Sequence, residues 1–335
     1  WQHVYTLNGV AGDVVHITAS RQSGTLLPRV ELQDLNGQSL TTGNVDDLGV
    51  TAASRAYELR ADGEYRVLMY RERGIDGDTV GEYELTVHLL GSGENSARLA
   101  TPPNTFEDYG EVLQGTITHA RWYEDWQFTA LAGDLITVTV TRQPEPDNTL
   151  RPQVILLGGA AQELRRGSVD TTGAGATIER YKLSAPGTYT VRVMRERGKS
   201  GVTTGQYELR VDVVGSGVGN PALDAVNEAI DVGVPVEGEI THMRWADTWT
   251  YNGQADDRVD IIVTRTSGTL APRVEILDAN RQSLRSAQVA VTGDTAILQR
   301  YQLPASAEYY IVVSRDRGQD GVTTGTYSLV IQPSE

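Results

Sequence analysis

Hydrophobic and polar residues alternate with a period of two along most of the chain. The clearest examples are residues 136–141, where Ile and Val alternate with Thr, and residues 189–193 and 207–213. Alternation of β-branched and aromatic residues is typical of strands with one buried face, and Gly, Pro and Asn-Gly turns separate the stretches. Only residues 221–230 (PALDAVNEAI) have a helical pattern, so we expect one helix in an otherwise all-β protein.

The same series of strands occurs three times. Each copy has an A-[GD]-D strand start, a T-L-x-P turn, a strand that ends in R-[ED]-R-G, and the motif G-x-T-x-G-x-Y-x-L. The strand starts at Ala11, Ala132 and Ala255 are 121 and 123 residues apart. A repeat of this length predicts three tandem antiparallel β-sandwich, jelly-roll-like domains of about eight strands each. The predicted boundaries are 1–93, 94–217 and 218–335, and each copy is long enough to bury a core.

The first copy differs from the others at its start. A strand pattern at residues 110–119 precedes Trp122, and another at 233–242 precedes Trp245, whereas the first copy begins at the equivalent Trp1. We therefore expect the first sandwich to lack its first strand and to leave an exposed edge or an open groove. Two explanations compete: an upstream segment of a longer array supplies the strand, or a neighbouring copy donates it and builds head-to-tail fibres.

The segments between copies read as short linkers. Gly-Ser-Gly follows the first copy at residues 91–93 and the second at residues 215–217. Linkers of this length permit limited hinge motion unless the neighbouring domains pack together.

Composition excludes several classes of protein. The chain has 29 basic and 44 acidic residues and a net charge of −15, which argues against nucleic acid as a partner. It has no Cys, which excludes disulfides, thiolate-held clusters and a thiol nucleophile. No apolar run approaches the roughly 20 residues of a membrane-spanning helix. Only Lys182 and Lys199 are lysines; every other basic residue is Arg.

No catalytic constellation is present, so we predict that the chain is not an enzyme. The motifs H-E-x-x-H, G-x-S-x-G and the P-loop are all missing from the sequence. Two of the five histidines, His119 and His242, occupy the same repeat position. They are either a repeated ligand contact or strand-edge residues with local hydrogen bonds, and we favour the second interpretation.

Two acidic loops of the first copy are candidates for calcium. One loop contributes Asn44, Asp46 and Asp47, and the other contributes Asp76 and Asp78. Calcium needs six to eight oxygen ligands, and the other copies retain few of these residues. We therefore predict no cofactor, with calcium in the first copy as the alternative.

Arginines recur at the ends of strands in every copy. Two continue the inward-facing series of one strand and a third ends another, so we expect three guanidiniums at one end of each sandwich. The nine residues are Arg21, Arg71, Arg73, Arg142, Arg195, Arg197, Arg265, Arg315 and Arg317. Because each guanidinium has five N–H donors, we predict a structural cluster that satisfies carbonyls of the glycine-rich loop. The alternative is a site for an anion or a sugar acid.

Aromatic residues recur with a spacing of four. The pairs are Trp1 and Tyr5, Trp122 and Trp126, and Trp245 and Trp249. This spacing places each pair on one face of a strand. Such aromatics either stack on a carbohydrate or fill the core, and the apolar strand positions beside them favour the core.

The combined pattern resembles the bacterial pre-peptidase C-terminal domain. The similarity lies in G-x-I-T, W-x-F-x-A-x-A-G-D-x-I-T-V-T, T-L-x-P-x-V-x-L and G-x-T-T-G-x-Y-x-L, and it covers nearly the whole chain. The resemblance implies a secreted β-sandwich that accompanies peptidases or occurs in surface proteins. Some relatives bind calcium, and some attach to insoluble substrates such as collagen.

Together these features predict a non-catalytic structural or adhesive repeat protein, extracellular or at the cell surface. We expect its partners to be other copies of itself, upstream domains, or an extracellular polysaccharide or protein matrix. We also expect the copies to assemble into a filament by β-strand complementation. The alternative is a substrate- or glycan-targeting module of a secreted hydrolase.

Overall fold

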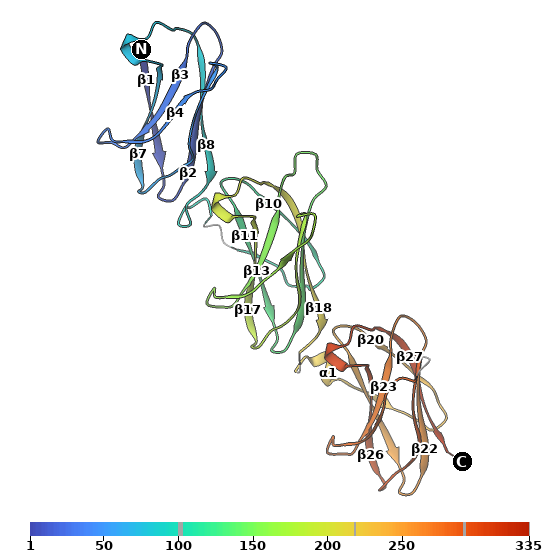
Figure 1. The fold of residues 1–335 in the computed structure, drawn as a ribbon. Helices are drawn as coiled ribbons and strands as arrows, with labels where there is room; N and C mark the ends of the chain where they lie inside the picture. The colour runs from blue at the N-terminus through green and yellow to red at the C-terminus, as the bar shows by residue number, and fades with distance from the viewer. Residues whose placement is uncertain (100–102, 218, 291–292, 335) are drawn as a thin grey trace.

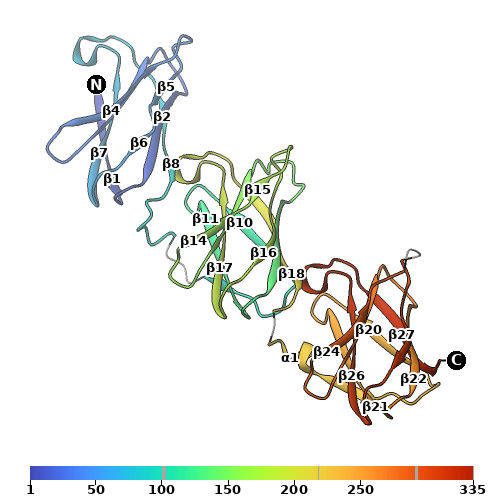
Figure 2. The same cartoon turned by 60° about the horizontal axis from the view of Figure 1, so that its bottom comes forward.

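The computed structural model contains three β-sandwiches in a row, with the termini at opposite ends (Figure 1). It describes residues 1–99, 103–217, 219–290 and 293–334. We call the sandwiches repeats 1, 2 and 3 in chain order; they contain strands β1–β8, β9–β18 and β19–β27. Figure 2 shows the same row of sandwiches after rotation. The all-β, antiparallel sandwich fold expected from the alternation is confirmed.

Repeat 2 consists of two five-stranded sheets. The first runs in the order β10 (Val112–Ile117), β18 (Gly205–Gly215), β12 (Leu135–Arg142), β16 (Gly175–Lys182), β15 (Ser168–Val169). The second runs β14 (Glu163–Arg166), β13 (Pro152–Leu157), β17 (Gly187–Arg195), β11 (Tyr123–Ala130), β9 (Asn104–Thr105). All pairings are antiparallel except that of β9 with β11.

Repeat 3 has the same arrangement with one strand fewer. Its sheets are β19 (Val226–Ala229), β21 (Ala246–Gly253), β26 (Ala307–Arg315), β23 (Pro272–Leu277), β24 (Ser283–Ala287), and β20 (Val236–Ile240), β27 (Gly325–Pro333), β22 (Arg258–Arg265), β25 (Thr295–Gln302).

Repeat 1 forms a single eight-stranded sheet that folds over on itself. Its order is β1 (Gln2–Gly9), β7 (Gly63–Arg71), β3 (Pro28–Gln33), β4 (Ser39–Val45), β5 (Thr51–Ser54), β2 (Val14–Arg21), β6 (Tyr57–Glu58), with β8 (Tyr83–Gly91) also paired to β2. Strand β4 crosses between the two layers at Gly43. A Cβ atom there would lie 2.3 Å from the backbone of Ala53, so the crossing requires glycine.

Each sandwich encloses its own core. In repeat 2, for example, the inward-facing Val138, Val140, Val191 and Val193 are fully buried, while Thr139 and Arg192, which lie between them on the two strands, are not. Separate clusters fill repeats 1 and 3. The alternation read from the sequence thus corresponds to one apolar layer between the two β-layers of each repeat.

The helix expected over residues 221–230 is wrong in extent. Helix α1 covers only Pro221–Asp224, capped by the Asn220 side chain, which accepts from the amide of Ala222. Ala225 is extended, and Val226–Ala229 is strand β19, which pairs with β21. Pairing with a sheet edge outweighs the helical propensity of these residues. No helix among the described residues is long and apolar enough to cross a membrane.

Candidate functional site

The two joints between successive repeats are built around a buried arginine. The side chains of Arg195 and Arg315 are fully buried. Arg195 donates from Nη2 to the carbonyl oxygen of Leu90, at the end of the last strand of repeat 1, over 2.5 Å. Arg315 donates in the same way to Val214 of repeat 2, over 2.8 Å.

Each of these arginines also holds the loop that follows its own strand. Arg195 donates from Nε to Gly198 O (2.8 Å) and from Nη2 to Lys199 O (2.9 Å), and Arg315 binds the carbonyls of Gly318 and Gln319 equivalently. One guanidinium therefore ties this loop to the preceding repeat. Burial lowers the pKa of both arginines to about 10, so they stay charged at neutral pH.

The Gly-Ser-Gly segments are parts of the joints rather than free linkers. The indole N–H of Trp122 donates to the carbonyl oxygen of Ser92 (2.9 Å), and that of Trp245 donates to Ser216 (3.0 Å). Ser92 and Ser216 are fully buried. The hinge motion allowed by the linker length is therefore opposed by direct packing between the repeats.

The first glycine of each segment permits a close approach between repeats. A Cβ on Gly91 would lie 2.3 Å from the carbonyl oxygen of Lys199, and one on Gly215 would lie 2.4 Å from that of Gln319. Strand periodicity predicts no such role for these two glycines. The signal was their repeated position before the next copy, but contact across the joint is not encoded by strand periodicity.

The third residue of the A-[GD]-D motif anchors the same segment from the other side. Asp13 accepts from the amide of Gly93 (3.0 Å), and Asp134 accepts from that of Gly217 (2.7 Å). Both carboxylates are buried. The segment that leaves each of the first two repeats is thus held by the repeat it leaves as well as by the one it enters.

The repeated histidines lie in the joints and contact the buried arginines. Nη1 of Arg195 is 3.2 Å from Nδ1 of His119, and Nη1 of Arg315 is 3.0 Å from Nδ1 of His242. Arginine only donates, so this contact is a hydrogen bond in the neutral form of the ring whose Nδ1 accepts; Nδ1 of His242 also lies 3.2 Å from the carbonyl oxygen of Val214. Burial, and then the adjacent arginine, lower the pKa of both histidines. The favoured expectation of purely local hydrogen bonds does not hold, since the partners are more than 70 residues away.

Both lysines of the chain bridge joints. Nζ of Lys199 forms an ion pair with Glu58 of repeat 1 (2.7 Å), and Nζ of Lys182 donates to the Gln319 side chain of repeat 3 (3.0 Å). The Gln319 amide also donates to Gly133 O and Ser216 O of repeat 2, over 2.6 and 2.8 Å. The second joint therefore has more cross-repeat bonds than the first among the described residues.

Arg71 of repeat 1 donates to the carbonyls of Gly74 (2.9 Å) and Ile75 (3.1 Å), and the other six predicted arginines divide into two groups. Arg21, Arg142 and Arg265 donate from Nη1 to the carbonyl of the leucine in each T-L-x-P turn, over 3.1, 3.2 and 3.0 Å. The inward direction expected for Arg73, Arg197 and Arg317 is wrong. The strand ends two residues earlier, the backbone turns to φ values of 61–64°, and these three side chains are exposed.

The aromatic pairs are also divided. Trp126 and Trp249 are buried in the cores of repeats 2 and 3, whereas Trp122 and Trp245 lie at the joints, outside the core clusters. In repeat 1 the equivalent Trp1 and Tyr5 are 57% and 43% exposed. The four-residue spacing therefore does not give each pair a common environment.

In repeats 2 and 3 the edge strands β10 and β20 cover a polar cluster. The Tyr207 hydroxyl donates to Glu124 (2.7 Å) and accepts from the indole N–H of Trp126 (2.8 Å). Gly115 of β10 lies above it, where a Cβ would be 2.3 Å from the hydroxyl oxygen. Tyr327, Asp247 and Trp249 repeat this arrangement under Gly238 of β20. Burial and the neighbouring carboxylate raise the pKa of both tyrosines.

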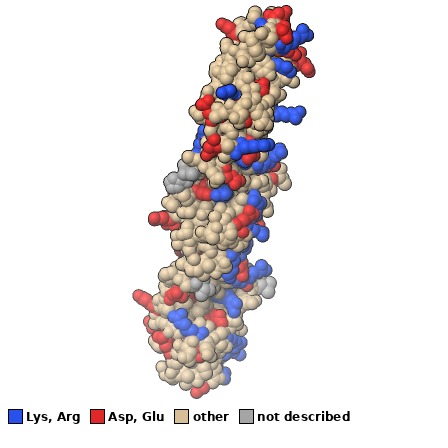
Figure 3. Space-filling model, turned by 90° about the vertical axis from the view of Figure 1, so that its left-hand side faces the viewer, with Lys and Arg blue, Asp and Glu red and all other residues tan. Residues whose placement is uncertain are grey.

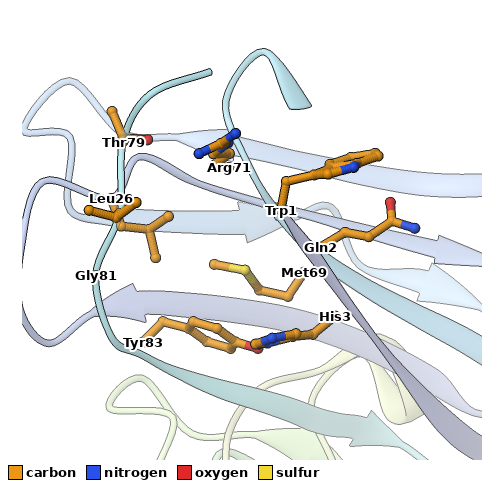
Figure 4. A pocket seen from close by; sticks show the side chains of 10 residues that line it. Trp1, Gln2, His3, Leu26, Met69, Arg71, Thr79, Gly81 and Tyr83 are labelled. Carbon is orange, nitrogen blue, oxygen red and sulfur yellow. The ribbon is translucent and has the colours of Figure 1, made fainter. Parts of the chain in front are cut away.

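In repeat 1 the equivalent cluster lies in an open groove (Figure 4). The hydroxyl of Tyr83 contacts that of Tyr5 (2.6 Å) and Nδ1 of His3 (2.5 Å). Beside it are two cavities of about 250 and 620 Å³. We call this region the acceptor groove; its lining includes His3, Tyr5, Leu26, Met69, Gly81, Tyr83, Leu85 and Val87.

The acidic loops considered for calcium have other contacts. The Asn44 side-chain oxygen accepts from Nε and Nη2 of Arg29 (3.1 and 2.6 Å), and Asp46 accepts from the amide of Val50 (2.9 Å). Asp47, Asp76 and Asp78 are exposed. Within the described ranges, no group of three or more His, Cys, Asp or Glu residues could hold a metal ion.

No family model and no curated protein matches the chain. Solved structures do. The pre-peptidase C-terminal domain of a collagenase from Bacillus anthracis is 17% identical and covers 32% of this chain and 94% of its own, with a TM-score of 0.27. The periplasmic g-type lysozyme inhibitor PliG of Salmonella Typhimurium is 18% identical over 33% of this chain and 98% of its own, with a TM-score of 0.23. A serine-rich repeat adhesion glycoprotein of Streptococcus agalactiae is 15% identical over 62% of this chain and 86% of its own, with a TM-score of 0.18. Matches with TM-scores this low carry no information on what this chain binds.

Proposed function

We propose that this chain is a non-catalytic, extracellular structural or adhesive protein whose three repeats act as a stiff spacer. The observation that carries the proposal is the repeated joint, in which a buried arginine of one repeat binds a main-chain carbonyl of the repeat before it. Domains that are joined only by a flexible tether do not bury a charged side chain between them, whereas domains with fixed packing can. Burying one is costly unless its hydrogen bonds are satisfied, and here they are.

Two further features support a structural role. The prominent hydrogen-bonded clusters of titratable groups, at the joints and around Tyr207 and Tyr327, serve packing between strands or repeats. On the face in Figure 3, acidic and basic side chains are interspersed along the length of the molecule, without a large region of one sign. The resemblance of the repeat motifs to pre-peptidase C-terminal domains favours export.

The proposal is tested on cells that make the protein. Antibodies against repeat 2 should label intact cells or extracellular material in electron microscopy, and protease added outside should degrade the antigen. Confinement of the antigen to the interior of unbroken cells would refute the proposal.

The exposed aromatics of repeat 1 favour one second candidate, a glycan- or substrate-targeting module. Trp1 and Tyr5 are accessible, in contrast to Trp126 and Trp249. Co-sedimentation with insoluble polysaccharides tests it: wild-type protein should sediment, and the Trp1→Ala/Tyr5→Ala variant should not. Equal behaviour of the two proteins would exclude an aromatic platform.

A further inference from the structure

Two histidines of repeat 1 lie directly opposite each other on the outer face of the sandwich. His16 of β2 is paired with His88 of β8 in an antiparallel register, and the two ring centroids are 5.8 Å apart with 36° between the ring planes. Side chains at directly opposed positions stand on the same face of the sheet and are close enough to interact. The neighbouring Val15 and Ile17 face the core, whereas His16 is half-buried and His88 is exposed, so both imidazoles can be reached from solvent.

The other two repeats carry different residues at these positions. At the same register, Thr137 faces Asp212 in repeat 2, and Asp260 faces Gln332 in repeat 3. The equivalent strands pair in the same way there, so the histidines are not needed to join them. The histidine pair is therefore a property of repeat 1 and not of the fold.

Two imidazoles at this separation fit one divalent transition-metal ion. A histidine nitrogen binds Zn²⁺ at about 2.0–2.1 Å, so one ion can bridge two rings whose centroids are up to about 6 Å apart. Imidazole suits zinc, copper and nickel, whereas calcium and magnesium prefer oxygen ligands. The histidine pair thus differs in chemistry from the acidic loops considered for calcium.

A hydrogen bond of His88 indicates which of its nitrogens is the ligand. Nε2 of His88 is 3.1 Å from the hydroxyl oxygen of Thr18. A metal-binding histidine commonly donates its other ring N–H to a neighbouring polar group, which fixes the tautomer and the orientation of the ring. With Nε2–H donating to Thr18, Nδ1 of His88 carries the lone pair for the ion.

We propose that His16 and His88 together bind one divalent transition-metal ion, such as Zn²⁺, through their imidazoles. In the part of the chain that the structure describes, no third His, Cys, Asp or Glu joins them, so water completes the coordination. The ion ties β2 to β8, and His88 lies two residues before Leu90, whose carbonyl oxygen accepts from Arg195 at the first joint. The site goes beyond the proposed structural function and does not depend on it.

The test is calorimetric titration of the 335-residue chain with zinc chloride. We expect saturable binding at this site, and the imidazole nitrogen NMR signals of His16 and His88 should move as zinc is added. His16→Asn and His88→Asn should each weaken this binding at least tenfold, because a single imidazole cannot chelate. Both variants should fold, since repeats 2 and 3 form the same strands without these histidines. Absence of saturable binding, or unchanged affinity in either variant, would overturn the proposal.

A matched control and a second measurement locate the site. His3→Asn removes another exposed histidine of the same repeat and should leave the affinity for zinc unchanged; loss of binding in this variant would place the ion elsewhere and contradict the proposal. Zinc should also raise the unfolding temperature of repeat 1 in the wild type, because an ion that binds only the folded pair stabilises it. An equal rise in the His16→Asn/His88→Asn variant would refute the site. Neither result depends on the joints or on where the protein is found in cells, so failure here leaves the proposed function to its own test.

Discussion

Arg315 donates a hydrogen bond to the carbonyl oxygen of Val214, which lies 101 residues earlier in the chain and in a different sandwich. Arg195 and Leu90 make the equivalent bond at the other joint. Because each arginine also holds the loop beside its own strand, docking of the repeats and order of this loop are coupled. The row of sandwiches is thus stabilised by the same residue type, at the same position, at both joints.

Replacing Arg315 should loosen the second joint. Arg315→Ala leaves the carbonyls of Val214, Gly318 and Gln319 without their charged donor, and we expect a loss of about 1–3 kcal/mol. Differential scanning calorimetry should show a lower unfolding temperature for repeat 3, and hydrogen exchange at the end of β18 should accelerate. Arg317→Ala is the matched control, since Arg317 is exposed, and it should change neither quantity. An Arg315→Ala protein that matches the wild type in both would contradict this role.

Gly215 should not tolerate a side chain. In Gly215→Ala the new Cβ would meet the carbonyl oxygen of Gln319 at 2.4 Å, so β18 and the loop of repeat 3 must separate. We expect faster cleavage by a non-specific protease at the joint. Gly159→Ala is the control, because its Cβ would lie 3.6 Å from its nearest neighbour. Equal cleavage rates for the two variants would show that the close approach is not needed.

The joints should weaken in mild acid. Burial and the adjacent arginine lower the pKa of His119 and His242 in the docked joint, while an undocked histidine titrates near 6.5. Above that pH both states carry the neutral ring and docking is independent of pH. Below it the undocked state binds the proton more readily, so docking weakens as the pH falls.

Other charged groups face these rings and do not reverse this sign. His88 and Arg195 lower the pKa of His119, and Arg315 and Arg180 lower that of His242, where Asp212 acts in the opposite direction. The maximum dimension from small-angle scattering, or the spread of inter-repeat distances, should increase between pH 7.5 and 5. The His119→Asn/His242→Asn variant should lose this dependence; a wild type that is unchanged over the same range would refute it.

Removing the Tyr327 hydroxyl should destabilise repeat 3. Tyr327→Phe leaves the buried Asp247 carboxylate and the Trp249 indole N–H without their shared partner, at a cost of about 1–3 kcal/mol. Chemical denaturation followed by tryptophan fluorescence measures the loss. Tyr310→Phe is the control, because a phenyl ring preserves the contact of the Tyr310 ring with Arg281. Equal losses in the two variants would mean that the hydroxyl adds nothing.

The sequence predicts the strands well and the joints poorly. Alternation places Val138, Val140, Val191 and Val193 in the core because every second residue of a strand lies on the face that packs against the core. The same rule fails beyond Arg71, where the backbone leaves the extended conformation and turns Arg73 outward. The alternation of inward and outward side chains holds only while the strand continues. Nothing in the alternation marks the residue at which the strand ends.

Contacts between repeats are hidden for a different reason. Gly91 and His119 are 28 residues apart in the chain, and the guanidinium that lies beside both belongs to Arg195. Such a contact depends on how two sandwiches dock, which no local pattern encodes. Residues 226–229 likewise form a strand rather than a helix because they pair with the edge strand β21.

Distances across the joints test the central claim, a fixed row of repeats, most directly. The chain has no Cys, so spin labels can be placed at single cysteines introduced at the equivalent, exposed positions Asp78, Val202 and Val322. Pulsed electron paramagnetic resonance on the pairs Asp78→Cys/Val202→Cys and Val202→Cys/Val322→Cys then reports one joint each. Fixed joints predict one narrow distance peak for each pair at neutral pH, broadened for the second pair by Arg315→Ala. Broad distributions in the otherwise unmodified protein would contradict the claim.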